Sequence, residues 1–88
     1  METKAVATWM LQELNKTGCL YQEDVVDFLI KQNLETHLVE NSDGNQVLSK
    51  AVLGKFLELT RENVVWVVPD RYWRFRVRED EPGRNARG

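Results

Sequence analysis

Hydrophobic residues recur at helical spacing early in the chain. Three of them follow one another at intervals of four residues: Val6, Met10 and Leu14. Thr3 stands ahead of them as a good N-cap, and Gly18 ends the pattern because glycine readily takes the left-handed conformation that closes a helix. The pattern predicts a helix over residues 4–17, followed by a short extended step at Cys19-Leu20-Tyr21.

Two further helices are predicted downstream. The second is predicted over residues 22–33. Its first turn carries acidic side chains, which the helix dipole stabilises at a helix N-terminus. Its expected buried stripe is Val25, Val26, Leu29 and Ile30. Ser49 is the N-cap of the third, over residues 50–61. Its wide apolar face consists of Val52, Leu53, Phe56, Leu57 and Leu59.

The segments between and after these helices are β-prone. Short apolar runs flank an Asp-Gly turn signal in residues 34–48, which fits either a small hairpin or an ordered loop. Residues 63–78 predict a C-terminal β-hairpin that turns at Pro69-Asp70. Residues 79–88 are rich in charge and predict a disordered tail, so residues 1–78 form a single domain.

The register of the C-terminal hairpin has two possibilities. A four-residue loop pairs Trp66 with Phe75 and makes one thick apolar face. A three-residue loop pairs Trp66 with Arg74 and leaves the tryptophan outside, where it is available for a cation–π contact. The sequence leaves both open, and the larger buried area favours the first.

The fold class is therefore α+β, with the order helix, short strand, helix, helix and β-hairpin. Over residues 4–78 this resembles a winged helix, a helix-turn-helix variant with a β-hairpin wing. The residues that carry the resemblance are Gly18 to Val25, Leu48 to Leu53, and the wing strands Val64-Val65-Trp66 and Tyr72-Trp73-Arg74. About fifteen residues separate the second and third helices, where that superfamily usually has a tight turn.

A closer resemblance covers nearly the whole chain. It is carried by Trp9-Met10, Gly18 to Glu23, Gly44-Asn45, Tyr72-Trp73-Arg74 and Asp80 to Arg84. These runs resemble an uncharacterised family of short bacterial proteins, some of which travel on mobile (integron-type) gene cassettes. The family has no established activity to carry over.

Composition narrows the class of protein. With 88 residues and one cysteine, the chain predicts one domain without an internal disulfide. The longest apolar run, Val64 to Val68, is far shorter than the ~20 residues that cross a bilayer. The N-terminus lacks the basic start and apolar stretch of a signal peptide. We expect a cytoplasmic protein with no membrane partner.

Charge is distributed unevenly along the chain. Residues 1–48 carry three lysines against eight acids, a net charge of −5, whereas residues 49–78 carry seven bases against three acids, a net charge of +4. This split suggests a face that binds polyanions or a homodimer that joins opposite poles. The alternative is that opposite charges simply alternate on the folded surface.

No constellation for catalysis is recognisable. His37 is a lone histidine in the loop region, and Cys19 stands between apolar neighbours where it predicts an inert, mostly buried thiol. Glu23, Asp24 and Asp27 are explained as well by a solvated helix face as by a carboxylate cluster. We expect neither enzymatic activity nor a cofactor, a metal or a small-molecule ligand.

Alternation in the last strand is the strongest local signal. It places arginines on one face and Trp73, Phe75 and Val77 on the other. The arginine face could bind phosphates. Alternatively, the apolar side chains are plain core and the arginines are solvated or pair with the acidic half. We predict a binding module for protein–protein contact or self-association, with nucleic-acid binding through the third helix and the wing as the alternative. The candidate interaction residues are Lys50, Lys55, Trp66, Arg71, Arg74 and Arg76.

Overall fold

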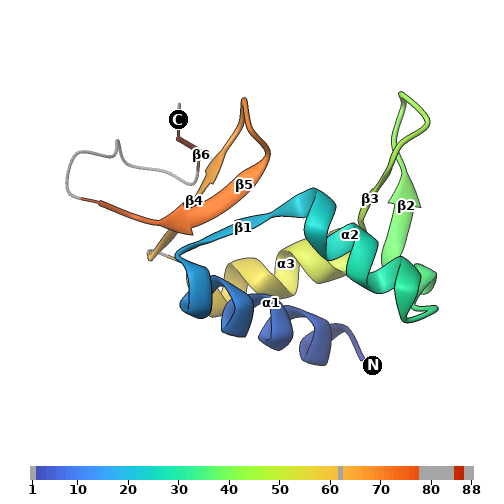
Figure 1. Cartoon of the computed structure of the whole chain (residues 1–88), viewed down its shortest axis with the longest axis horizontal. Helices are drawn as coiled ribbons and strands as arrows, with labels where there is room; N and C mark the ends of the chain where they lie inside the picture. Colours follow the sequence, from blue (N-terminus) through green and yellow to red (C-terminus); the bar gives the residue numbers. More distant parts are fainter. Residues whose placement is uncertain (1, 62, 78–84, 87–88) are drawn as a thin grey trace.

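The computed structural model of the chain describes residues 2–61, 63–77 and 85–86. Within these ranges the chain is α+β (Figure 1), with three α-helices and two small sheets. The elements in order are α1 (Thr3–Thr17), β1 (Cys19–Tyr21), α2 (Gln22–Lys31), a 3-10 turn (Glu35–His37), β2 (Leu38–Glu40), β3 (Gln46–Leu48), α3 (Lys50–Thr60), β4 (Val64–Val67), β5 (Tyr72–Phe75) and β6 (Asn85–Ala86).

Helix α1 agrees with its prediction except at the N-cap. Glu2, not Thr3, is the capping residue, and its side chain makes no capping hydrogen bond. Gly18 ends the helix at a φ of 83°, and its N–H donates to the carbonyl oxygen of Leu14 at 2.7 Å. The predicted stripe of Val6, Met10 and Leu14 is buried, together with Ala7.

Helix α2 ends two residues before its predicted end. Asn33 takes a left-handed φ of 58°, and the N–H of Leu34 donates to the carbonyl oxygen of Leu29 at 2.8 Å, which closes the helix. Of the predicted buried stripe, Val25 and Leu29 are buried, whereas Ile30 is 42% exposed. The prediction for Ile30 is wrong because only one edge of α2 faces the core.

Helix α3 begins as predicted, with Ser49 Oγ accepting a hydrogen bond from the Val52 N–H at 3.4 Å. Its buried residues are Val52, Phe56 and Thr60. The remaining leucines of the predicted wide face are exposed: Leu53, Leu57 and Leu59. The buried face of α3 is therefore narrower than the sequence pattern indicates.

Of the two structures that the sequence allows between α2 and α3, a small hairpin or an ordered loop, the structure has the hairpin. Strands β2 and β3 pair antiparallel with Leu38 opposite Leu48. Asn41 Oδ1 accepts hydrogen bonds from the N–H groups of Asp43 and Asn45 at 2.9 and 3.0 Å, and Gly44 has a φ of 81°. An asparagine and a glycine thus fix this turn.

Strands β1, β5, β4 and β6 form the larger sheet in that order, antiparallel except for β4 with β6. Trp66 stands opposite Trp73, so both predicted hairpin registers are wrong. Val68 leaves the strand and joins a loop that closes when the N–H of Arg71, at a left-handed φ of 54°, donates to the carbonyl oxygen of Val67 at 2.9 Å. The strand therefore ends one residue earlier than the sequence indicates.

The core lies between the helices and one face of this sheet. Trp73, 4% exposed, packs edge-on against Phe56 of α3 with ring centroids 5.1 Å apart. Trp66 packs on Trp73 at 4.7 Å. Phe75 and Val77, expected on the same apolar face, are 37% and 51% exposed, because β5 ends at Phe75.

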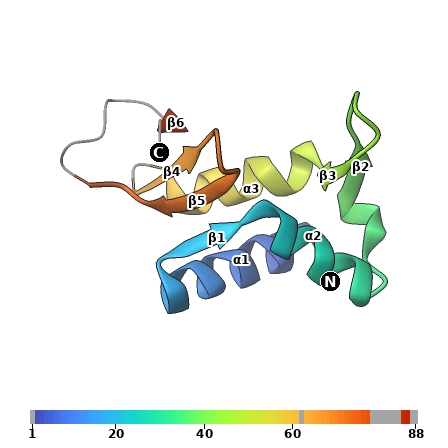
Figure 2. The same cartoon turned by 45° about the horizontal axis from the view of Figure 1, so that its top comes forward.

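The two hairpins lie at opposite ends of the molecule. Figures 1 and 2 show the larger sheet at one end, the β2–β3 hairpin at the other and α2 between them. Of the predicted disordered tail, only Asn85 and Ala86 are described, and they pair in parallel with Trp66 and Val67. The other residues of 78–88 lie outside the described residues.

Candidate functional site

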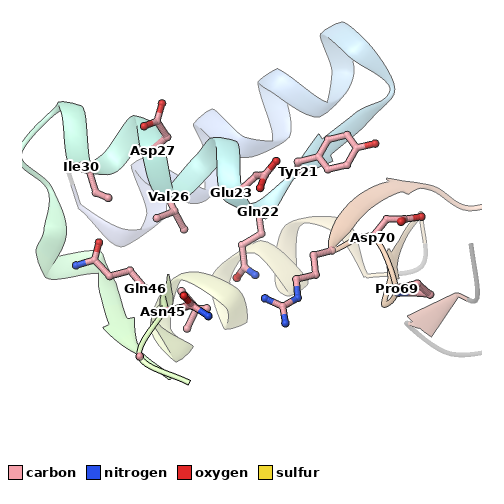
Figure 3. A pocket seen from close by; sticks show the side chains of 13 residues that line it. Tyr21, Gln22, Glu23, Val26, Asp27, Ile30, Asn45, Gln46, Pro69 and Asp70 are labelled. Carbon is pink, nitrogen blue, oxygen red and sulfur yellow. The ribbon is translucent and has the colours of Figure 1, made fainter. Parts of the chain in front are cut away.

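A groove of about 730 Å³ runs between the two hairpins, with α2 along one side. Three segments line it: residues 21–30 around α2, residues 44–47 of the first hairpin, and residues 69–71 in the turn of the second. Figure 3 shows these side chains, and we call this feature the inter-hairpin groove.

Helix α2 contributes two adjacent rows of side chains to the groove. Gln22, Val26 and Ile30 are spaced four residues apart, so they share one face of the helix. In Figure 3 this row points toward the first hairpin, whereas Asp27 of the neighbouring row points away from it. The α2 wall is therefore polar at its N-terminal end and aliphatic at its C-terminal end.

The wall from the second hairpin is tied to the start of α2. The Gln22 N–H donates to the carbonyl oxygen of Arg71 at 3.1 Å, which satisfies one of the free amides at the helix N-terminus. Just before it, Tyr21 of β1 pairs with Tyr72 of β5. The turn and the helix are thus held together by backbone contacts.

The wall from the first hairpin is fixed at its base. Leu38 and Leu48 are buried in the core, and the Ser49 N–H donates to the carbonyl oxygen of His37 at 2.9 Å. Because both walls are anchored by backbone hydrogen bonds and core packing, the groove is preformed. A preformed groove binds with a smaller ordering cost than one that must close on its ligand.

Carboxylates outnumber cations in the groove lining. Glu23, Asp27 and Asp70 stand against Arg71. Asp27 forms an ion pair with Lys31 at 2.8 Å, which raises the pKa of Lys31 above 10.5, chiefly through their hydrogen bond. Within the described part of the chain, Glu23 and Asp70 have no ion-pair partner. The described lining residues therefore carry three carboxylates against one guanidinium, and Lys31 balances one of the three.

Tyr21 marks one end of the groove. Its ring is 39% exposed and lies 4.9 Å from the ring of Tyr72. Desolvation raises the pKa of Tyr21 above 10.0, and Cys19, Tyr72, Asp70 and Asp24 raise it further through their charge. The phenol therefore stays neutral at physiological pH, as a hydrogen-bond donor and an aromatic face.

Comparison with known proteins relates the chain to one family. The family model matches residues 2–75, which include every residue that lines the groove. The chain belongs to DUF6953, a family of unknown function. The DUF6953 match extends from the start of α1 to the end of β5. No curated protein and no solved structure matches the chain.

The two lysine candidates of this DUF6953 chain lie on α3. Lys50 is exposed at its first residue, and Lys55 pairs with Glu58 at 2.8 Å. That pair lowers the pKa of Glu58 below 4.5, mainly through the hydrogen bond from Lys55. This pair, like Glu13–Lys16 in α1 and Asp27–Lys31 in α2, lies within one helix.

The candidates on the second hairpin lie elsewhere. Arg71 lines the groove, and Trp66 is half-buried against the core. Arg74 follows Trp73 in β5, so it projects from the sheet face opposite α3, where its Nη1 donates to the carbonyl oxygen of Phe75 at 3.1 Å. Arg76 follows β5, and its N–H donates to the carbonyl oxygen of Asn63 at 2.7 Å. The structure does not bring the six candidates to one face.

The residues considered for catalysis form no cluster. Among the described residues, no group of three or more histidine, cysteine or acidic side chains could hold a metal ion. Cys19 is partly buried, because β1 turns Leu20 into the core and Cys19 to the other face of the strand. No helix in the described ranges has the length and apolarity needed to cross a membrane.

Sequence reasoning missed most of the groove. The helical spacing of Val26 and Ile30 matches a buried stripe, and Glu23 and Asp27 fit a solvated helix face, so neither pattern indicates a groove. The signal for a second contact was the width of the apolar stripe on α2, which covers more of the helix surface than one contact with the core buries. Only Arg71 was identified as a candidate in advance.

Proposed function

We propose that this chain is a small, non-enzymatic binding module that mediates protein–protein contact, either with another protein or with a second copy of itself. The observation that carries the proposal is the inter-hairpin groove of about 730 Å³, which sets exposed apolar side chains beside carboxylates and amides. Apolar anchors with a polar rim are typical of sites that bind protein segments.

We also infer that the fold is a winged-helix variant. Support comes from the order of elements, in which β1 lies between α1 and α2 and pairs with β5 of the hairpin that follows α3. The β2–β3 hairpin, inserted between α2 and α3, is the departure from that pattern. Because this insertion supplies one wall of the groove, the departure itself creates the proposed binding site.

The origin and location of the protein are part of the same proposal. The resemblance of Gly18 to Glu23 and Tyr72 to Arg74 to a bacterial family, some of whose members are carried on mobile gene cassettes, supports a bacterial origin. A single cysteine without a partner supports the cytoplasm, where thiols stay reduced.

Nucleic-acid binding is the weaker candidate. Its surface would have to combine α3 with the wing, yet Lys50 and Lys55 lie on the helix side of the sheet and Arg74 on the other. Helical geometry also turns Ala51, Gly54 and Glu58 outward from α3, and none of them is a good reader of base edges. We therefore favour protein contact.

Site-specific photo-crosslinking in living cells tests the proposal. A photoreactive benzoyl-phenylalanine replaces Ile30 or Gln46 in the groove, with Leu57 on the exposed side of α3 as the matched control. We expect ultraviolet-dependent protein adducts at the two groove positions and none at Leu57. An adduct of about twice the chain's 10.3 kDa mass identifies a second copy, and any other mass identifies another protein.

Two results would contradict the proposal. One is the absence of protein adducts at both groove positions while the labelled variants remain folded. The other is an adduct only at Leu57, which would move the binding surface to α3.

A further inference from the structure

The Tyr21 end of the groove is built to receive a cation. Tyr21, Glu23 and Asp70 all line this part of the groove, and the pKa of the Tyr21 phenol, which is raised chiefly by desolvation, is also raised by the charge of Asp70. An aromatic face beside carboxylates binds lysine or arginine side chains through cation–π and ionic contacts. Neither Glu23 nor Asp70 has an ion-pair partner among the described residues.

The other end of the groove is built to receive an aliphatic side chain. Val26, Ile30 and Val47 line it from α2 and β3, and Ile30 is more exposed than a core isoleucine would be. Between the two ends stand the side-chain amides of Gln22 and Asn45, which can bond to a peptide backbone.

We propose that the occupant of the inter-hairpin groove is a short basic segment of a partner protein, with a lysine or arginine at the Tyr21 end and an aliphatic residue between α2 and β3. This inference rests on the proposed function and names its partner class. The two sites are separated along α2 by about 5–10 Å, from the helical rise between Glu23 and the Val26–Ile30 pair. An extended segment covers that distance in about two or three residues.

Charge complementarity selects this occupant over an acidic or neutral one. Three carboxylates and one arginine line the groove, so an acidic segment would be repelled and a neutral one would leave Glu23 and Asp70 uncompensated. Lys31 balances only Asp27, on the rim. Arg71 lies on the turn wall, where it suits a backbone carbonyl or the carboxylate of the segment.

The test is a selection from a random dodecapeptide display library against the immobilised full chain. We expect enrichment of peptides with lysine or arginine spaced two or three residues from leucine, isoleucine or valine. Fluorescence anisotropy then measures a selected peptide against the wild-type chain and three variants. The double variant Glu23→Lys/Asp70→Lys and the single variant Ile30→Asp should each weaken binding about tenfold or more.

A matched control distinguishes an effect of the groove residues on affinity from an effect of the net charge of the chain. Glu13→Lys/Glu35→Lys makes the same change in net charge outside the groove and should alter affinity by less than about twofold. Circular dichroism confirms that every variant is folded. Spermidine and free arginine, titrated as competitors, should displace the peptide only weakly.

Each other outcome has a distinct meaning. Neutral or acidic peptides that lose affinity in Ile30→Asp would overturn the basic-segment inference but leave a protein-binding groove. Peptides whose affinity is unchanged by every groove variant would overturn both proposals. Spermidine that binds as tightly as the peptide would make this a site for small cations and contradict the inference. If the chain selects no peptide and sedimentation shows a dimer that Ile30→Asp abolishes, the occupant is a second copy.

Discussion

At the scale of single residues, the backbone of Arg71 controls the second hairpin. Its φ of 54° is left-handed, a region in which an L-amino acid with a Cβ is strained by roughly 1–2 kcal/mol. Its carbonyl oxygen also accepts the hydrogen bond from Gln22 that joins the turn to α2. One residue thus sets the length of the loop and the position of one groove wall.

This strain predicts the effect of Arg71→Gly. Glycine removes the steric cost at a positive φ, although its greater freedom in the unfolded chain offsets part of the gain. We expect the free energy of unfolding, measured by urea denaturation, to rise by about 0.5 kcal/mol. Arg74→Gly in β5, where φ is not positive, should lower it. A lower stability for Arg71→Gly would contradict the role of strain at this turn.

Left-handed residues also explain which local features the sequence could predict. Among the described residues, Gly18 and Gly44 have a positive φ, which glycine adopts readily. The sequence therefore predicts the end of α1 and a turn within residues 41–45. Asn33 and Arg71 also have a positive φ. Because neither is a glycine, the end of α2 was predicted two residues late and the register of the second hairpin was missed.

At the scale of elements, α3 offers a direct test of its outward face. A Cβ built on Gly54 meets nothing within 4 Å, and the residue is helical. Gly54→Ala should therefore raise the free energy of unfolding by about 0.5–1 kcal/mol, since alanine is the better helix former. It should not change binding at the groove. The control Gly18→Ala, at a φ of 83°, should be destabilising. Loss of binding in Gly54→Ala would place an interface on α3.

The same helix carries a pH-dependent pair. Lys55 lowers the pKa of Glu58 below its ordinary 4.5, so the pair contributes stability above that pH and loses it as the pH falls through the folded pKa. We expect carbon-detected NMR titration to give Glu58 a pKa below 4.5 that rises in Lys55→Met. The effect on stability is small because the pair is exposed. An unchanged pKa in the variant would show that the pair does not form in solution.

Helix α2 shows why the groove itself could not be predicted. Its apolar residues are spaced as a single buried stripe. Val25 and Leu29 are buried in the core, whereas Ile30 is exposed in the groove, and Val26 both packs against the core and lines the groove. The spacing is the same in both cases. What differs is the position of a hairpin made by residues 38–48, which helical periodicity does not contain.

At the scale of the whole molecule, the distribution of charge favours protein–protein contact over nucleic-acid binding. The acidic half of the chain supplies Glu23 and Asp27 to the groove, whereas Lys50 and Lys55 of the basic half lie on α3, Arg71 lies in the turn of the second hairpin and Arg74 lies in β5. We therefore expect little or no binding to labelled duplex DNA or RNA at physiological salt in an anisotropy titration. Micromolar binding that weakens in Arg74→Ala/Arg76→Ala, with a log–log salt slope near −2 to −3, would favour the nucleic-acid function instead.

The central claim is that the inter-hairpin groove is the binding surface of this module. The most direct measurement is amide chemical-shift mapping by NMR on the full chain as a basic–aliphatic peptide from the selection is added. The account predicts that the largest shifts fall on Gln22, Val26, Ile30, Gln46 and Asp70, with the outward residues Ala51 and Gly54 of α3 unmoved. Shifts concentrated on α3, with the groove amides unchanged at saturation, would contradict it.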